Sequence, residues 1–197
     1  MKRPLGCTAS ASAVALTLGG FNAGVETVPK WDWYDSTVAL RIPNTKRPES
    51  ATAIATGADE IDVVIAYAAL RDGDLKAAGD DLSAVVDTAR AERGDVVVKA
   101  IIESAQLSDD EIVLACGLVA AAGADFAKTS TGHAGGASVR AVSLMRASLP
   151  PSVAVKASGG IRTADAALDM LDAGATRIGT SNALSIIAEL ETHALAG

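Results

Sequence analysis

From about residue 51, short apolar runs alternate with segments whose apolar residues recur every three or four positions. The apolar runs predict β-strands at 61–65, 96–102, 124–130, 153–157 and 177–180. The periodic segments predict helices at 75–93, 108–122, 138–148, 163–174 and 182–194. Ser108 and Glu111 have the spacing of a capping box at the start of the second of these helices. Strands therefore alternate with helices through this part of the chain.

The predicted strands are apolar over most of their length, which is typical of strands buried on both faces. Such strands form parallel sheets whose crossovers are helices. The turns from helix to strand also repeat, as Gly57–Ala58–Asp59, Gly123–Ala124–Asp125 and Gly174–Ala175–Thr176. A repeated turn indicates equivalent units. Residues 51–197 therefore read as βα units of an α/β fold.

The first fifty residues differ in composition from the rest. They carry a net charge of +2, against −9 for the remainder, and hold four of the six prolines and both tryptophans. An apolar stretch at 13–18 follows two basic residues, but serines at 10 and 12 break the apolar centre that a signal needs, so we expect no secretory signal. We expect an irregular chain here. The Trp31–Tyr34 cluster is expected to be a local hydrophobic anchor, and the less favoured alternative is a binding patch.

Composition excludes several classes of protein. The chain has 197 residues, 49% of them hydrophobic, which suits one domain, and no apolar run is long enough to span a bilayer. A net charge of −7 argues against nucleic acid as a partner. Cys7 and Cys116 are too far apart for a disulfide scaffold, and neither they nor the two histidines have metal-ligand spacing. This usage suits the reducing cytoplasm.

Lysine occurs inside three successive predicted strands, as Lys99, Lys128 and Lys156. A buried ammonium is costly and usually has a partner or a depressed pKa. Any one of these lysines could reach solvent at a strand end or pair with a carboxylate such as Glu103 or Asp62. For Lys128 and Lys156 together, each followed by a glycine-containing loop, we favour a functional role.

The repeated turns also predict where the charged side chains lie. Counting five residues on from each turn glycine gives Asp62, Lys128 and Gly179. In a closed βα barrel, alternate strands contribute side chains to one interior layer. We therefore expect a carboxylate and an ammonium in the same part of the interior.

This combination predicts imine chemistry. A neighbouring cation lowers the pKa of a lysine, and the neutral amine attacks a carbonyl to form a Schiff base. The protonated imine then accepts electrons when a neighbouring carbon–carbon bond breaks. A carboxylate such as Asp62 can move the protons that these steps require.

The loops after the last three predicted strands favour an anionic substrate. They are Ser130–His133, Ser158–Gly160 and Gly179–Asn182. A single glycine turn is usually only a turn, but glycines at the ends of successive strands, with helix N-termini beside them, favour phosphate binding. No dinucleotide fingerprint or Gly-Lys-Ser/Thr phosphate loop is present. His133 could make a polar contact in this region, whereas His193 is expected in solvent.

These segments, in order over residues 54–190, resemble the deoxyribose-phosphate aldolases. The stretches that carry the resemblance are Gly57–Ile65, Lys99–Glu103, Gly123–Gly132, Val155–Thr163 and Gly174–Ser181. The family is one of Schiff-base (class I) aldolases with a TIM (β/α)8 barrel. The resemblance implies reversible cleavage of 2-deoxyribose 5-phosphate to glyceraldehyde 3-phosphate and acetaldehyde.

The resemblance also implies a role for each matching residue. Lys128 would form the Schiff base, with Lys156 as the second lysine beside it and Asp62 as the proton-relay carboxylate. The phosphate-side residues would be Thr131, Gly132, Gly159, Gly160 and Ser181, with His133 and Asn182 as further substrate contacts. No cofactor or metal is implied, because the lysine itself forms the covalent imine.

By this resemblance, residues 54–197 are the catalytic portion and hold strands four to eight of the barrel. Residues 1–53 are an atypical N-terminal segment, either irregular or replacing the first barrel units. The implied partners are small phosphorylated sugars and aldehydes and further copies of the chain, without nucleic acid or membrane, in the cytoplasm. Two alternatives stay open: a catalytically impaired barrel fragment that binds phosphate ligands or is structural, and another phosphate-handling barrel enzyme, such as an isomerase, whose lysines act electrostatically.

Overall fold

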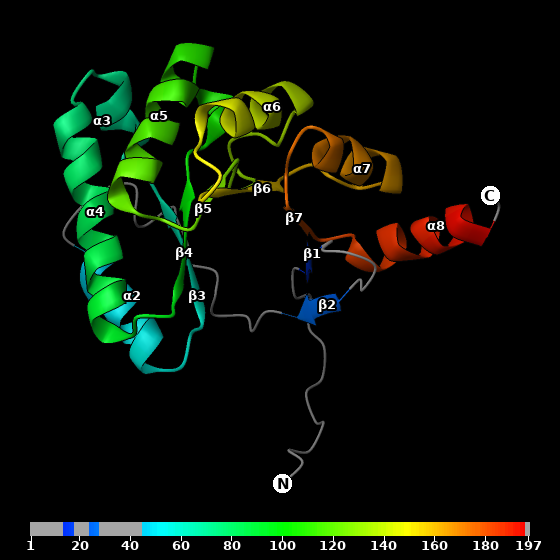
Figure 1. The fold of residues 1–197 in the computed structure, drawn as a ribbon, viewed down its shortest axis with the longest axis horizontal. Coiled ribbons are helices and arrows are strands. Elements are labelled where there is room, and N and C mark those ends of the chain that lie inside the picture. Colours follow the sequence, from blue (N-terminus) through cyan, green and yellow to red (C-terminus); the bar gives the residue numbers. More distant parts are fainter. Residues whose placement is uncertain (1–13, 18–23, 28–44, 196–197) are drawn as a thin grey trace, which may run out of the picture.

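The computed structural model describes residues 14–17, 24–27 and 45–195 of the chain (Figure 1). The Trp31–Tyr34 cluster and most of the stretch weighed as a targeting signal lie outside these ranges. No helix in the described ranges has the length and apolar character that crossing a membrane requires.

The strands of the described residues form one sheet in the order β2-β1-β7-β6-β5-β4-β3, in which β1 is Val14–Thr17 and β2 is Gly24–Thr27. From β3 to β7, neighbouring strands are parallel. They are β3 (Glu60–Val64), β4 (Val97–Ile101), β5 (Phe126–Lys128), β6 (Ala154–Ser158) and β7 (Arg177–Thr180). Each coincides with a predicted strand, so the α/β architecture expected from the apolar runs is confirmed.

Helices follow the parallel strands and cover the convex side of the sheet (Figure 1). They are α3 (Tyr67–Arg71), α4 (Leu75–Glu92), α5 (Asp109–Ala122), α6 (Val139–Ser148), α7 (Ala164–Asp172) and α8 (Ala183–Leu195). A single 3₁₀ turn among the described residues, η1 (Ser104–Gln106), follows β4. Helix α5 begins at the predicted capping box, in which the Ser108 hydroxyl accepts from the Glu111 N–H and the Glu111 carboxylate accepts from the Ser108 N–H.

Among the described residues, one helix and two strands begin before the predicted regular part. Helix α2 (Lys46–Ala55) crosses residue 53, where we placed a boundary, and its Ile54 joins the hydrophobic core. The Lys46 ammonium is buried; it pairs with Asp81 of α4 and donates to the carbonyl oxygen of Val64 at 2.9 Å. This helix is therefore fixed to the βα units, and the division of the chain at residue 53 stays a prediction.

Strands β1 (Val14–Thr17) and β2 (Gly24–Thr27) extend the sheet beyond β7. Strand β1 is antiparallel to β7, with Val14 opposite Thr180, and β2 is antiparallel to β1. In a complete βα barrel the neighbour of each strand is parallel. The sheet thus departs from the barrel pattern at this edge.

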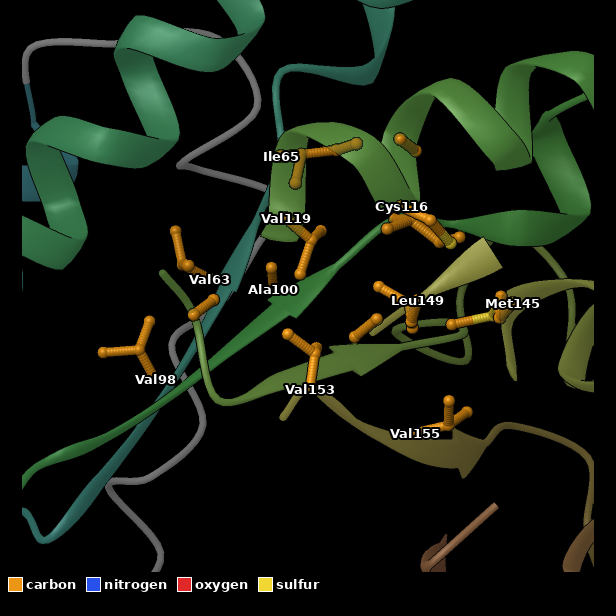
Figure 2. Packing of buried hydrophobic residues seen from close by; sticks show 14 of the residues in the cluster. Val63, Ile65, Val98, Ala100, Cys116, Val119, Met145, Leu149, Val153 and Val155 are labelled. Carbon is orange, nitrogen blue, oxygen red and sulfur yellow. The ribbon is translucent and has the colours of Figure 1, made fainter. Parts of the chain in front are cut away.

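Successive residues of each parallel strand face opposite sides of the sheet. On β3, Ile61 and Val63 join the hydrophobic core beneath the helices, as do Val98 of β4 and Val155 of β6. Figure 2 shows this layer of small and β-branched side chains, as expected from a composition with 3% aromatics. The residues between them face the concave side, and there the strands carry their charged side chains.

The register of the strands shows that the sheet is curled. Asp62 lies opposite Lys99 on β4, whereas Lys128 lies opposite Ile101, two residues further along that strand. Likewise Lys128 lies opposite Lys156 on β6, while Gly179 lies opposite Ser158, again two residues further. An advance of about one residue per strand is that of an eight-stranded barrel with a shear of about 8.

The predicted interior layer is therefore confirmed, because Asp62, Lys128 and Gly179 occupy equivalent heights once this shear is included. The curl also brings distant strands together across the concave face. Arg177 of β7 reaches Glu60 of β3, with 2.6 Å between Nη1 and Oε2.

Candidate active site

The carboxylate of Asp62 lies at the centre of the concave face. Its Oδ2 is 2.6 Å from the Nζ of Lys128 and 3.3 Å from the Nζ of Lys156. Its Oδ1 accepts from Lys99 at 2.9 Å. The residues predicted as the catalytic group are thus brought together, although the strand of Asp62 is not adjacent to those of the two lysines.

These side chains are withdrawn from solvent. Asp62 is 5% exposed, Lys128 is fully buried and Lys156 is 6% exposed. Burial by itself would raise the pKa of the Asp62 carboxyl, but the charges of Lys128, Lys156 and Lys99 and the hydrogen bond from Lys128 hold it well below its ordinary value. Asp62 is therefore an anion at neutral pH, in a cluster where cations predominate.

The same surroundings favour the neutral form of Lys156, whereas they favour the charged form of Asp62. Burial, followed by repulsion from Lys128 and Lys99, lowers its pKa to about 8, although Asp62 acts to raise it. An amine with a pKa near 8 exchanges protons readily at physiological pH. Lys156 is thus suited to proton transfer beside Lys128.

Glu60 and Arg177, two charged residues that sequence reasoning missed, extend this cluster. The Lys99 ammonium contacts Glu60 Oε2 at 2.5 Å as well as Asp62, and Glu60 also holds Arg177. Burial acts to raise the pKa of the Glu60 carboxyl, but Lys99 and Arg177 together hold it below its ordinary value. Of the two partners considered for Lys99, the structure selects Asp62.

Glu103, the other partner considered, has a different role in the structure. It is buried two residues beyond the end of β4, and its carboxylate accepts hydrogen bonds from Thr131, at 3.1 Å from the backbone N–H and 2.7 Å from the hydroxyl. Its φ of 54° is left-handed, a conformation that costs a residue with a side chain about 1 kcal/mol or more. Glu103 therefore fixes the loop that follows Lys128.

The loops after β5 and β6 pack tightly against each other. A Cβ at Gly136 would lie 2.6 Å from the carbonyl oxygen of Gly159, and a Cβ at Gly159 would lie 3.4 Å from the Cα of Gly132. The Ala137 N–H donates to that same Gly159 oxygen at 3.0 Å. The structure thus brings Gly132 and Gly159 together at the carboxyl edge of the sheet.

The other predicted phosphate-side residues lie in loops at this edge. Gly160 is exposed with a φ of 77°, and Ser181 is exposed and donates to the side-chain oxygen of Asn182 at 3.2 Å. The Thr180 hydroxyl donates to the carbonyl oxygen of Ile161 at 2.6 Å, which joins the end of β7 to the Gly159–Gly160 loop. His133 is exposed in its loop, and the side chain of His193 lies outside the described part of the structure.

Gly179 lies beside the lysine cluster. A Cβ there would stand 3.2 Å from Cε of Lys156 and 3.0 Å from Cβ of Ser158. The absence of a side chain at Gly179 therefore leaves the space that Lys156 occupies. In the described ranges, no group of three or more His, Cys, Asp or Glu residues is arranged to hold a metal ion.

Comparison with known proteins gives the family. The model of the DeoC/LacD family of aldolases matches residues 32–187. The chain belongs to the DeoC/LacD aldolase family. The five segments that carried the resemblance in the sequence all lie within the matched residues.

Several members of the family are similar over most of this chain. The deoxyribose-phosphate aldolase of Streptococcus uberis is 51% identical over 146 residues, which are 74% of this chain and 64% of that one. That of Rhodospirillum rubrum is 45% identical and covers 90% of this chain and 71% of its own. That of Brevibacillus brevis is 39% identical and covers 98% and 79%. The chain spans 64% of the length of the Streptococcus uberis and Bacillus licheniformis relatives.

Solved aldolase structures share the fold. The aldolase QR15 has a TM-score of 0.72 and 36% identity, over 80% of this chain and 70% of its own. The tetrameric deoxyribose phosphate aldolase of Aeropyrum pernix has a TM-score of 0.68 and 32% identity, over 76% and 62%. The curled parallel sheet of this DeoC/LacD aldolase is thus part of a TIM barrel, as predicted.

Proposed function

We propose that the chain is a class I aldolase that reversibly cleaves 2-deoxy-D-ribose 5-phosphate to D-glyceraldehyde 3-phosphate and acetaldehyde. The observation that carries the proposal is the contact of Lys128 and Lys156 with one oxygen of the buried Asp62 carboxylate, at 2.6 and 3.3 Å. Relatives that are 39–51% identical bear the name of this enzyme.

In this proposal Lys128 is the nucleophile. Its amine, once neutral, attacks C1 of the open-chain sugar and expels water to leave a protonated imine. The C2–C3 bond then breaks as the C3 hydroxyl loses its proton, and the electron pair moves into the imine to give an enamine. Protonation at C2 and hydrolysis release acetaldehyde and restore Lys128.

Asp62 and Lys156 would carry the protons of this sequence. Lys156, with its pKa lowered to about 8, takes and returns a proton near neutral pH. Asp62, held ionised by the lysines around it, passes protons between these two amines through its Oδ2. Since catalysis runs through the lysine imine, we propose that no metal or other cofactor takes part.

The substrate phosphate would lie at the glycine loops, beyond the lysines. Gly132 and Gly159 are packed together there, and backbone N–H groups without side chains in front of them can approach an anion closely. We assign phosphate contacts to Thr131, Gly132, Gly159, Gly160 and Ser181, with His133 and Asn182 as further contacts. We also propose that the enzyme acts in the cytoplasm, as a homo-oligomer and without nucleic acid or membrane.

Borohydride trapping tests the proposal. The folded protein is incubated with acetaldehyde, reduced and digested, and the modified peptide is identified by mass spectrometry. We expect a reduced ethyl adduct on Lys128 and none in Lys128→Met. Lys46→Met is the matched control, because Lys46 is also a buried lysine in an ion pair but lies outside the site.

Each other outcome excludes part of the proposal. A folded protein that gives no adduct would be a catalytically impaired barrel or a phosphate-binding protein. An adduct on Lys156 in place of Lys128 would overturn the assignment of the nucleophile while keeping the reaction class.

A further inference from the structure

The two acidic residues of β3 hold one lysine between them. Glu60 and Asp62 are two positions apart, so both face the concave side of the sheet. Lys99, directly opposite Asp62 on β4, places its ammonium 2.5 Å from Glu60 Oε2 and 2.9 Å from Asp62 Oδ1. Lys99 is 2% exposed, so both contacts are made away from water.

Glu60 is itself held from the last of the parallel strands. Arg177 of β7 contacts the same Oε2 at 2.6 Å, and its guanidinium lies over the ring of Phe126, 4.7 Å from the centroid. Arginine stacked on an aromatic ring and paired with a carboxylate has little freedom to move. The Lys99 ammonium is thus bound to a carboxylate whose own position is fixed.

We propose that Lys99 is a positioning residue for Asp62, binding one carboxylate oxygen so that the other faces both Lys128 and Lys156. The inference rests on the proposed function, because it concerns how Asp62 is oriented within the site that would carry out that function.

Because several charged groups face Asp62, its two carboxylate oxygens have to bind different partners. In the described residues, Lys99 of β4, Lys128 of β5 and Lys156 of β6 surround it, while Glu60 neighbours it on β3 and Arg177 of β7 lies beyond Glu60. Without Lys99, Oδ1 would be a buried acceptor lacking this partner, at a cost of about 1–3 kcal/mol. The carboxylate would then turn toward the remaining amines and lose its orientation.

The variant Lys99→Met tests this role. We expect kcat to fall about 100-fold, at the lower end of what a positioned acid–base group contributes, with KM nearly unchanged. Removing this cation also relieves the repulsion that Lys156 experiences, so the pH–rate profile shifts to higher pH. Lys99→Arg keeps the charge and should recover most of the profile.

A second measurement does not depend on activity. With lysine labelled at ¹³Cε, NMR titration follows each amine directly, and we expect the Lys156 midpoint, near 8 in the parent protein, to rise in Lys99→Met. Lys46→Met removes a lysine that is equally buried, at 2% exposed, and paired with Asp81 outside the site. This control should lose stability without moving the midpoint.

The outcomes separate this inference from the proposed function. If borohydride traps no imine in the parent protein, the aldolase proposal fails, but the titration still decides whether Lys99 governs the cluster. If the parent protein is active and Lys99→Met keeps its kcat, its pH profile and its Lys156 midpoint, Lys99 is only a structural ion pair and the inference is wrong.

Discussion

The Lys128 ammonium lies 2.6 Å from Asp62 Oδ2 although strand β4 runs between their two strands. The contact is possible because the sheet is curled and its register advances along successive strands. Both side chains consequently meet on the concave face. Three amines then contact one carboxylate, because Lys99 and Lys156 also lie within 3.3 Å of Asp62.

Replacement of Asp62 by Asn tests this dependence. The amide keeps the shape of the side chain but removes the negative charge that the buried lysines contact, so we expect the free energy of unfolding to fall by about 3–5 kcal/mol. Activity should fall by roughly 10²–10⁴-fold because the proton relay is lost. Denaturant unfolding and steady-state assays measure the two effects.

The pH dependence of that stability loss gives a further check. The folded pKa of Asp62 is lowered, so its stabilising contribution is present above the unfolded value near 3.9 and is lost as the pH falls toward the folded value. The difference between the parent protein and Asp62→Asn should therefore narrow below about pH 4. A difference that stays constant to pH 2 would contradict the ionised state assigned to Asp62.

Lys156→Met should behave in the opposite way. The folded pKa of Lys156, about 8, is below its ordinary value, so its charged form destabilises the folded state at neutral pH and this cost is relieved as the pH rises through about 8 to 10.5. We expect Lys156→Met to be at least as stable as the parent protein at pH 7, yet to lose activity. A clear loss of stability at pH 7 would show that the Asp62 contact outweighs the cost of burial.

Gly136→Ala tests the packing of the glycine loops. The new Cβ would stand 2.6 Å from the Gly159 oxygen, so the loops must separate, at a cost of about 1–3 kcal/mol. We expect KM for 2-deoxyribose 5-phosphate to rise, with a much smaller effect on unphosphorylated 2-deoxyribose. Gly94→Ala is the control, since a Cβ there meets nothing within 4 Å. An equal effect on both sugars would argue against a phosphate site in these loops.

Sequence reasoning located the elements and interactions that have a local or repeated signal. The capping box at Ser108 lies within four consecutive residues, and the common turn before three strands fixed the relative heights of Asp62 and Lys128. Lysine inside an apolar strand is also conspicuous by itself. These features were confirmed because each depends on few residues close in sequence or on a repeat.

Other features had no such signal. Glu60 and Arg177 form an ion pair across 117 positions, and its existence depends on how far the sheet curls. Helix α3 spans five residues, too few for a periodicity, and α2 lies in a segment whose prolines and charge pointed to irregular chain. The left-handed backbone of Glu103 likewise accompanies a contact with Thr131, which only the folded chain brings near.

The ion pair between Glu60 and Arg177 has a consequence for how the protein folds. The charged groups of the concave face come from every strand from β3 to β7, and a buried charge whose partner is missing costs several kcal/mol. An intermediate holding only some of these strands would have to leave its lysines in water and its interior open. The electrostatics of the site thus favour all-or-none assembly of these βα units, so that the sheet curls and the site becomes complete in the same step.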